Sequence, residues 1–410
     1  MRHLILLAGL SAAVALGGCA ATRCVQCGGE PEGPPPPAGK ILAERPPTPT
    51  PDLSGLPPSA VSAPGGKGLP IAGPHRAFEA MDAQCRAVAV CPLANALAVE
   101  SQKAACPDRQ SDEVKSQVLA FRAVEERNKA AGQAMELFYL LAEAEAGLDL
   151  LHRSKENLAA MLEDVDRLEK QGIRVERGLA ELRRQWPDAL DREAQAHLAV
   201  EQANSHLRQL LGFSPEETEP IWPSADWRVI AEPLDEQAAI CTGLSHRPDI
   251  GLLAMLAQSV DDETVEGARA GLSALPGLPA SPVASHLLHG HKSGKCGSRG
   301  GHFDELLAYR QQEATEEIRL AVRTIGIRLQ QIAIAKLKVD GCQNQIESLR
   351  LRRTRGDTTV SVLDVGAAEM QLLQQQNELA HQVMAWRIAQ IKLKQAQGLL
   401  AFECGMGCGP

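Results

Sequence analysis

A short segment gathers side chains that can bind a metal ion. His286, His289, His291, Cys296 and His302 lie within 17 residues, and imidazole and thiolate groups are common ligands of Zn²⁺ and softer cations. Their spacing matches no strong zinc pattern, and glycines are frequent around them. We therefore keep two interpretations: a soft-metal site and, as the more ordinary one, a solvated, disordered loop.

Other patterns of reactive residues are weaker. Cys24 and Cys27 form a Cys-x-x-Cys pair in a Pro/Gly-rich stretch, where a local disulfide or free thiols are more ordinary than a zinc half-site or a redox pair. The Gly-Ser-Arg-Gly-Gly run at 297–301 follows no expected strand, which argues against a phosphate-binding loop. No Ser/His/Asp set or carboxylate pair stands out from the charged helix faces. We therefore expect neither an enzyme nor a bound cofactor.

The first residues are typical of an exported lipoprotein. A basic start precedes an apolar stretch at 4–16 that is too short to span a bilayer. It ends in Leu-Gly-Gly before Cys19, the order of a signal peptide (1–18) whose removal exposes a lipidated cysteine. A plain secretory signal is the alternative. Acyl chains on Cys19 would anchor the protein to a membrane.

Cysteine usage is compatible with export. The chain has 11 Cys, so an even number remains once Cys19 is set aside. An oxidising compartment permits these residues to pair as disulfides. Cys85, Cys91 and Cys106 are close enough in sequence for one local bridge.

Composition narrows the fold classes. Of 410 residues only Phe 6, Trp 4 and Tyr 2 are aromatic, while 44% are apolar, so the core must be built from Ala, Leu, Val and Ile. This disfavours sandwiches, propellers and other folds that use aromatic and β-branched strands. The net charge of −9 arises from 42 basic and 51 acidic residues and provides no basic footprint for nucleic acid.

Long helices are the elements expected to position these residues. A tether at 19–75 holds 14 of the 26 prolines and is expected to be disordered. From near Arg76 the pattern is helical, with apolar seams in two Pro-free segments, 111–171 and 303–355. Helices of roughly 50–60 residues would be about 80–90 Å long, which indicates coiled coil. The seams are Leu137, Leu141, Ala144, Leu148, Leu151, Leu158, Leu162 and Val165, and then Ile318, Val322, Ile325, Leu329, Ile332, Ala335, Val339, Cys342, Ile346 and Leu349.

The two halves of the chain repeat one plan. Gly356 lies 184 positions after Gly172, and the same shift superposes five apolar residues of the two seams. A second helix follows each glycine and ends at Gly212 or Gly398, with Pro187 expected to kink or split the first of these. We infer an all-α fold of two long antiparallel coiled-coil helical hairpins with little or no β structure. The expected divisions are repeat one (76–213), an irregular connector (214–233), repeat two (234–400, helical from 234 to 269 with a break at Pro248) and a disordered tail (401–410).

Three motifs resemble the outer-membrane efflux proteins of TolC type. Leu210-Leu211-Gly212-Phe213 closes repeat one. Arg247-Pro248-Asp249 opens repeat two and is the most specific marker. The third motif is the second hairpin tip, with Gly356, Thr359, Ser361, Leu363 and Asp364. Together the motifs extend the resemblance over residues from about 76 to 400.

The resemblance implies that both hairpin tips face a periplasmic adaptor and the entrance of a duct. Glycine permits the positive φ of a tight reversal, Thr359 or Ser361 can cap the return helix, and Asp364 favours the positive end of its dipole. In the family an acidic ring position aligns with Asp364, and a simple helix-start charge is the alternative. The tip after Gly172 departs from the family, because 173–178 lacks the Thr/Ser and Asp.

Two further expectations concern the junctions between elements. Arg247-Pro248-Asp249 is interpreted as structural, because Pro fixes the backbone at a helix junction while Arg and Asp pair locally. The family inserts a β-hairpin before each long first helix, whereas 271–301 and the stretch near 91–111 contain no pair of alternating strands. We therefore expect this chain to lack the family's transmembrane β-strands and to depend on its lipid anchor.

The function that the resemblance implies is a trimeric efflux duct. Three protomers would supply twelve helices to a tube that works with a periplasmic adaptor protein and an inner-membrane transporter to export small molecules or ions. The absence of Asp after Cys19 suggests the outer membrane, with the body in the periplasm. The alternative is a non-conducting periplasmic coiled-coil lipoprotein that acts as an envelope scaffold or adaptor-binding protein.

Overall fold

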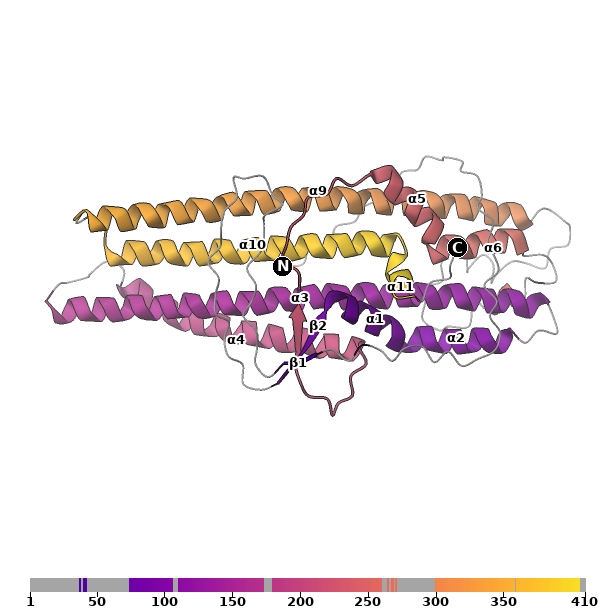
Figure 1. Cartoon of the computed structure of the whole chain (residues 1–410), viewed down its shortest axis with the longest axis horizontal. Coiled ribbons are helices and arrows are strands. Elements are labelled where there is room, and N and C mark those ends of the chain that lie inside the picture. The colour runs from indigo at the N-terminus through magenta and orange to yellow at the C-terminus, as the bar shows by residue number, and fades with distance from the viewer. Residues whose placement is uncertain are drawn as a thin grey trace.

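Four long helices dominate the molecule. The computed structural model describes residues 37, 40–42, 74–105, 110–172, 179–259, 264, 267–268, 270, 299–357 and 359–405. The long helices run along its longest axis (Figure 1): α3 (Gln110–Lys170), α4 (Leu179–Leu210), α9 (Arg299–Thr354) and α10 (Val362–Ala396). The predicted all-α fold of two long helical hairpins is confirmed.

The long helices form a single layer of four columns. Within it α3 packs against α4 and α10, and α10 also packs against α9. Two shorter helices extend the columns: α2 (Pro92–Ala104) packs on α3 in line with α4, and α6 (Pro248–Ser259) lies between α3 and α9 in line with α10 (Figure 1). The column of α9 is therefore one edge of the layer, and the column of α4 with α2 is the other.

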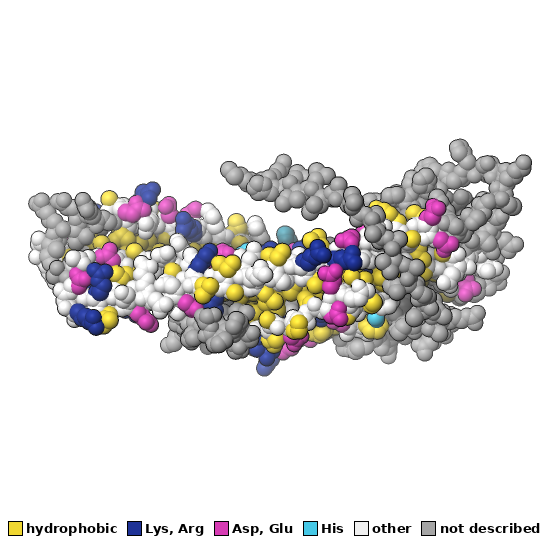
Figure 2. Space-filling view, turned by 90° about the horizontal axis from the view of Figure 1, so that it is seen from above, with side chains coloured by type: hydrophobic (Ala, Val, Ile, Leu, Met, Phe, Trp, Pro, Cys, Tyr) yellow, Lys and Arg dark blue, Asp and Glu magenta, His cyan; other side chains and the backbone are white. Residues whose placement is uncertain are grey.

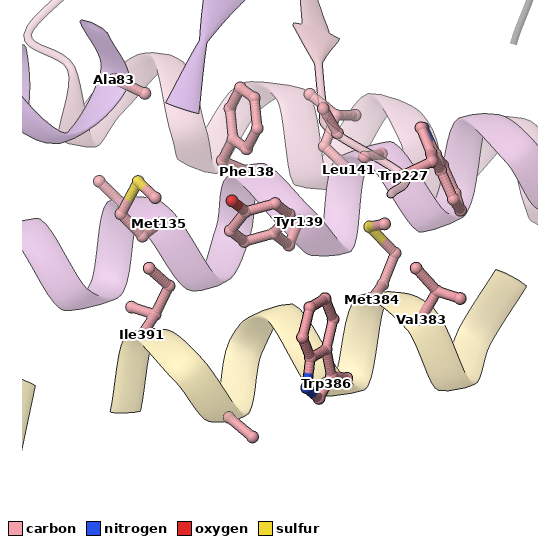
Figure 3. Packing of buried hydrophobic residues seen from close by; sticks show 14 of the residues in the cluster. Ala83, Met135, Phe138, Tyr139, Leu141, Trp227, Val383, Met384, Trp386 and Ile391 are labelled. Atoms are coloured by element: carbon pink, nitrogen blue, oxygen red, sulfur yellow. The ribbon is translucent and has the colours of Figure 1, made fainter. Parts of the chain in front are cut away.

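The predicted seams are the buried faces of these helices. Along α9, Ile318, Ile325 and Ile332 recur every seventh residue and are at most 3% exposed. Between α3 and α10, Met135 lies opposite Ile391, as Figure 3 shows. Because propensity alone does not hold helices of this length, burial of the seams is what stabilises them.

A small sheet lies beside the layer and was not predicted. Its order is β1 (Lys40–Leu42), β2 (His75–Glu79) and β3 (Ile221–Ser224), antiparallel between β1 and β2 and parallel between β2 and β3. One strand thus lies in the segment expected to be a disordered tether, and another lies in the connector expected to be irregular. The Arg86 side chain also donates to the carbonyl oxygen of Pro37 at 2.9 Å.

The C-terminal end corrects one expectation and contains a disulfide. The chain forms α11 (Leu399–Glu403) where a disordered tail from residue 401 was expected. Cys85 is bonded to Cys404, 319 residues away, and not to Cys91 or Cys106, with which the spacing would have allowed a local bridge. Cys91 is a free thiol. Sequence proximity could not identify this pair, because the fold alone brings α1 (Ala80–Val90) beside α11.

Two prolines behave differently in their helices. Pro187 was expected to kink or split its helix. It lies inside α4 and does not split it. Pro248 is the first residue of α6, so the helical stretch from 234 is interrupted as predicted, with α5 (Glu236–His246) before it. At a first helical position proline loses no hydrogen bond. None of the described helices combines the length and apolar character needed to cross a membrane.

The duplication extends to the short helices. The pair α1–α2 meets at Cys91-Pro92, and the pair α5–α6 meets at Arg247-Pro248, 156 positions later. In each half, the glycine that follows the second long helix packs against the first helix of the short pair. Gly212, after α4, contacts α1, and Gly398, after α10, contacts α5. A Cβ at Gly212 would lie 3.1 Å from the Val90 side chain, and one at Gly398 would lie 2.9 Å from the carbonyl oxygen of His246.

Substituting Gly398 and Gly356 separates the effect of backbone strain from that of crowding. Gly398 and Gly356 have φ of +77° and +82°, but a Cβ at Gly356 has nothing within 4 Å. We expect Gly356→Ala to lower the free energy of unfolding by about 1–2 kcal/mol, the strain of the left-handed region. Gly398→Ala should cost about 1–3 kcal/mol more, because the backbone at His246 must move. Urea denaturation measures both, and equal losses would contradict the close contact.

Candidate functional site

The second hairpin tip is built from a glycine reversal and a capping box. Gly356 donates its N–H to the carbonyl oxygen of Arg353 at 3.0 Å, which closes the end of α9. Ser361 then caps α10: its hydroxyl oxygen accepts from the N–H of Asp364 at 3.1 Å, and the Asp364 carboxylate accepts from the N–H of Ser361 at 2.7 Å. The Ser361 hydroxyl also donates to the Asp364 carboxylate at 2.7 Å, and this bond, followed by that from the Ser361 N–H, lowers the pKa of Asp364. The reciprocal caps satisfy groups that a helix start leaves open.

Thr359 has a different role from the one expected. Its N–H and hydroxyl both donate to the Asp357 carboxylate, at 2.9 and 2.6 Å. Arg352 donates to the same carboxylate at 2.9 Å. The Thr359 hydrogen bonds, followed by those of Arg352, lower the pKa of Asp357 to about 2. Sequence reasoning missed Asp357, although an Asp directly after a helix-ending glycine is a common turn signal.

An apolar cluster beneath the tips joins the two hairpins. Leu158, Met161 and Val165 of α3 and Leu182 of α4 are buried there, and Leu363 of α10 packs against them. Leu363 therefore anchors the second tip to the first hairpin. The first tip begins at Gly172, with φ of +79° and open space where a Cβ would lie. The remaining residues of that tip, 173–178, lie outside the described part of the chain.

The second tip also carries a group of basic residues that sequence reasoning passed over. Arg350, Arg352, Arg353 and Arg355 are all exposed at the end of α9. Arg350 is paired with Glu369 at 2.6 Å, and Arg352 is paired with Asp357. Neither Arg353 nor Arg355 forms an ion pair with any residue that the structure describes. Positive charge at the C-terminal end of a helix is favourable for the helix dipole.

The Arg-Pro-Asp motif is the centre of a partly buried ion network, in which Arg247 is the most buried side chain. Arg247 donates to both oxygens of Asp249, at 3.0 and 2.8 Å, and also to Glu317 at 2.5 Å and to the carbonyl oxygen of Ala396 at 3.0 Å. Arg310 donates to Asp249 at 2.7 Å. The network thus ties the α5–α6 junction to α9 and to the end of α10.

Burial and pairing act in opposite directions at Asp249. Burial alone would raise the pKa of this carboxyl, but the hydrogen bonds and charges of Arg247 and Arg310 outweigh it and lower the pKa to about 2. The carboxylate is therefore ionised throughout the physiological pH range. Local pairing of Arg247 with Asp249 was predicted, but Arg310 and Glu317 were not. They lie seven positions apart on one face of α9, and only the packing of α9 on α6 shows what that face meets.

Several predicted residues lie outside the described part of the chain. They include Cys19 and the signal peptide, and the candidate metal ligands His286, His289, His291 and Cys296. His302 lies within α9, but its side chain is not described. Among the residues that the structure does describe, no group of three potential ligands could hold a metal ion. The metal site therefore stays a prediction.

Solved outer-membrane channels share this arrangement of helices. The chain matches the Campylobacter jejuni CmeC outer membrane channel with a TM-score of 0.51 and 14% identity, over 70% of this chain and 66% of that one. It matches the outer-membrane channel OprN with a TM-score of 0.54 and 14% identity, over 70% of each chain. A membrane protein from Pseudomonas aeruginosa matches with a TM-score of 0.50 and 14% identity, over 70% and 72%.

The fold is therefore TolC-like, as the sequence motifs implied. Identities this low establish the fold alone. No protein-family model matches the sequence, and no curated protein matches it.

Removal of the Asp249 charge should destabilise the protein at neutral pH but not in acid. Because the pKa of Asp249 is lowered to about 2, the ionised carboxylate contributes about 2 kcal/mol to the folding free energy. Because the folded pKa is depressed, this contribution is present above pH 4 and is lost as pH falls towards 2. We expect Asp249→Asn to reduce the free energy of unfolding by about 2 kcal/mol at pH 7, and the difference from wild type to shrink below pH 4.

Asp357→Asn is the matched control for this measurement. Asp357 has the same lowered pKa, but its partner Arg352 is exposed at the tip whereas Arg247 is buried, so water screens the tip pair more strongly. Urea denaturation at several pH values should therefore show a much smaller effect than for Asp249→Asn. If the two variants behaved alike, burial of the Arg247 network would not be the source of its contribution.

Proposed function

We propose that the protein is a component of an outer-membrane-associated efflux duct. Three copies close their helical layers into a tube, through which small molecules or ions leave the cell with the help of a periplasmic adaptor and an inner-membrane pump. The observation that carries this proposal is a second, exposed apolar stripe on α9, at the edge of the layer.

The second stripe runs along the side of α9 opposite the buried seam. Leu320, Ile327 and Ile334 recur every seventh residue and are 62%, 54% and 54% exposed. Each lies two positions after a buried seam residue, and two positions correspond to about 200° around a helix. Figure 2 looks onto this edge of the layer and shows hydrophobic side chains gathered along it. A helix with apolar stripes on opposite sides is suited to packing between two partners.

Two glycines on α9 support close approach of another helix. Gly326 and Gly341 are exposed, and a Cβ at either position would have nothing within 4 Å. Glycine in the middle of a helix costs about 1 kcal/mol relative to alanine, and no contact within the described protomer accounts for it. Close packing of a second helix backbone against this edge would account for both glycines.

The opposite edge offers the complementary surface. Leu190 and Leu198 on α4, and Leu93 and Val99 on α2, are 38–58% exposed. Because the two apolar edges lie on opposite sides of the layer, copies would join head to tail, with α9 of one beside the α4–α2 column of the next. Contacts of this kind close into a ring when the layer curves, and three copies supply twelve long helices.

The ends of the tube would have separate roles. Both hairpin tips lie at one end of the long axis (Figure 1), and in the proposed duct they form the entrance and meet the adaptor. Asp364 would then be a rim residue as well as a cap. Lipidation at Cys19 would hold the body at the outer membrane, on the periplasmic side.

Charge placed on the exposed stripe should abolish assembly and conductance together. We expect the purified wild type to be a trimer by multi-angle light scattering and to raise ion conductance in planar bilayers. Ile327→Lys with Ile334→Lys should remain monomeric, because each lysine would have to be buried without a partner. Ile230→Lys, a change at a comparably exposed residue of the connector, should remain a conducting trimer.

Gly341→Leu provides a second test in which the helix itself is not weakened. Leucine favours helix more than glycine does, so this variant should fold, yet its side chain would block close approach along the edge. We expect loss of the trimer with an unchanged helical signal in circular dichroism. A monomeric wild type without conductance would contradict the duct and favour the alternative, a non-conducting envelope scaffold or adaptor-binding lipoprotein.

Lipid anchoring is tested by where the protein fractionates. Cys19→Ser should move the chain from the membrane fraction to the soluble periplasmic fraction, because a lipidated cysteine is the proposed attachment. Cys24→Ser, five residues later, should stay with the membrane. Mass spectrometry of the mature N-terminal peptide should show acyl chains on the wild type only. Retention of Cys19→Ser in the membrane would refute the anchor.

A further inference from the structure

The last described helix is docked by a cluster of contacts from three other helices. Gly398, with φ of +77°, turns the chain out of α10, and α11 then packs against α1, α3 and α10. Leu400 and Ala401 are completely buried in this position. The docking therefore joins the start of repeat one to the end of repeat two.

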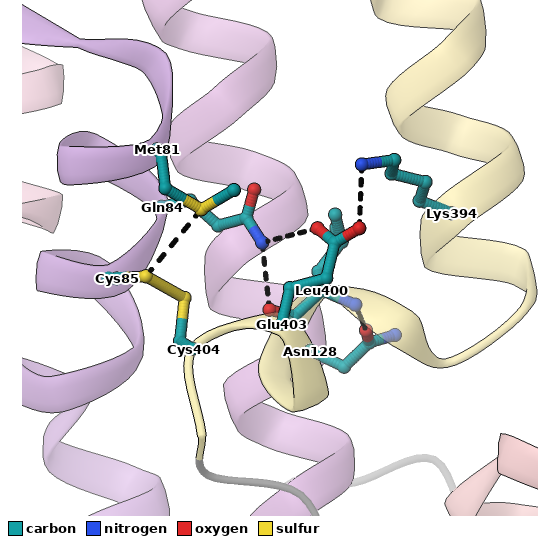
Figure 4. Close-up of a disulfide and its surroundings, with 8 residues drawn as sticks. All are labelled: Met81, Gln84, Cys85, Asn128, Lys394, Leu400, Glu403 and Cys404. Carbon is teal, nitrogen blue, oxygen red and sulfur yellow. Dashed lines mark hydrogen bonds and ion pairs between the residues drawn. A yellow bond between two sulfur atoms is a disulfide. The ribbon is translucent and has the colours of Figure 1, made fainter.

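Polar side chains hold α11 from two sides (Figure 4). Gln84 of α1 donates to the carbonyl oxygen of Leu400 at 2.8 Å and to the Glu403 carboxylate at 3.0 Å. Asn128 of α3 accepts from the N–H of Leu400 at 3.1 Å, and Lys394 pairs with Glu403 at 2.6 Å. Together with the buried Leu400 and Ala401, these few hydrogen bonds are the non-covalent part of the docking, and the net gain from each hydrogen bond is small.

One covalent bond completes the docking. Cys85 on α1 and Cys404, directly after α11, form a disulfide between residues 319 positions apart. Both cysteines are partly exposed, so we expect a small dithiol to have access to the bond. Disulfides that are accessible to solvent are the ones that thiol–disulfide exchange opens most readily.

We propose that the Cys85–Cys404 disulfide is a redox-controlled clasp for the C-terminal segment. A thiolate of a dithiol attacks one of the two sulfur atoms and releases the other cysteine as a thiolate. The second thiol of the reductant then displaces the first, so that the reductant leaves as a cyclic disulfide. Two electrons and two protons pass from the dithiol to Cys85 and Cys404, and α11 is left with its non-covalent contacts alone.

Opening of the clasp changes how the two repeats are held together. With the disulfide closed, α11 cannot leave α1 even when its hydrogen bonds break, because the broken contacts re-form at high effective concentration. With the disulfide open, the segment can swing about Gly398, expose Leu400 and Ala401, and free the start of repeat one from the end of repeat two. This inference does not rest on the proposed duct.

Hydrogen exchange on the full chain, with and without dithiothreitol, tests the clasp. We expect peptides covering 399–405 to lose protection by about tenfold or more on reduction, as expected for a local opening reaction. Cys85→Ser with Cys404→Ser should show the fast exchange without reductant and no further response to it. Cys91→Ser, which removes a free thiol near the end of α1, should respond to dithiothreitol as the wild type does.

Two results would overturn the proposal. Peptide mapping of the oxidised protein should yield a linked pair containing Cys85 and Cys404, and absence of that pair would remove its basis. Equal protection of 399–405 in the oxidised and reduced wild type would show that the disulfide does not control docking. Both readings are independent of conductance, so they separate failure of the clasp from failure of the duct.

Discussion

A seven-residue apolar repeat along the long helices is the constraint on which the rest of the structure depends. Helices as long as α3 and α9 are not held by propensity, so they persist because Ile318, Ile325 and Ile332, and their counterparts on α3, are buried. A seam of this period keeps one side of each helix facing its neighbour over many turns. The helices must then lie nearly parallel, and the chain becomes a layer rather than a compact bundle.

In a layer the inner helices bury apolar side chains on both sides, whereas the edge helices bury them on one side only. The two inner helices, α3 and α10, have neighbours on both sides. At the edge, α9 keeps Leu320, Ile327 and Ile334 exposed along the side away from α10. Among the described residues, the exposed apolar side chains that could cover that stripe lie at the other edge of the layer. In the proposed ring, the seven-residue repeat that builds the protomer would also join one copy to the next, which is the physical argument for the helical tube.

The sequence was a reliable guide wherever local signals decided the outcome. Glycines at positive φ and the apolar period placed the ends of the long helices within a few residues, and the Ser361 cap follows from its position before Asp364. Contacts between distant segments could not be predicted from the sequence, because no local pattern indicates which elements will pack together. The small sheet, the Cys85–Cys404 bond and the contact of Arg247 with Glu317 all belong to this class. The duplication of the short helix pairs, 156 positions apart, leaves one mark in the sequence: Pro92 and Pro248 each begin the second helix of a pair.

The two repeats share a backbone arrangement, but different interactions hold the short helices against the long ones in each. In repeat two, Arg247 holds the end of α10 through the carbonyl oxygen of Ala396 and is itself held by carboxylates. Repeat one has Cys91 at the matching position, and Arg86 holds the end of α4 instead, donating to the carbonyl oxygen of Leu211 at 2.6 Å. Its first helix also carries the disulfide. Acid acts on the ionic fastening by protonating carboxylates, whereas a dithiol acts on the covalent one. Acid is therefore expected to act on the junction inside repeat two, whereas a dithiol acts on the link between the start of repeat one and the end of repeat two.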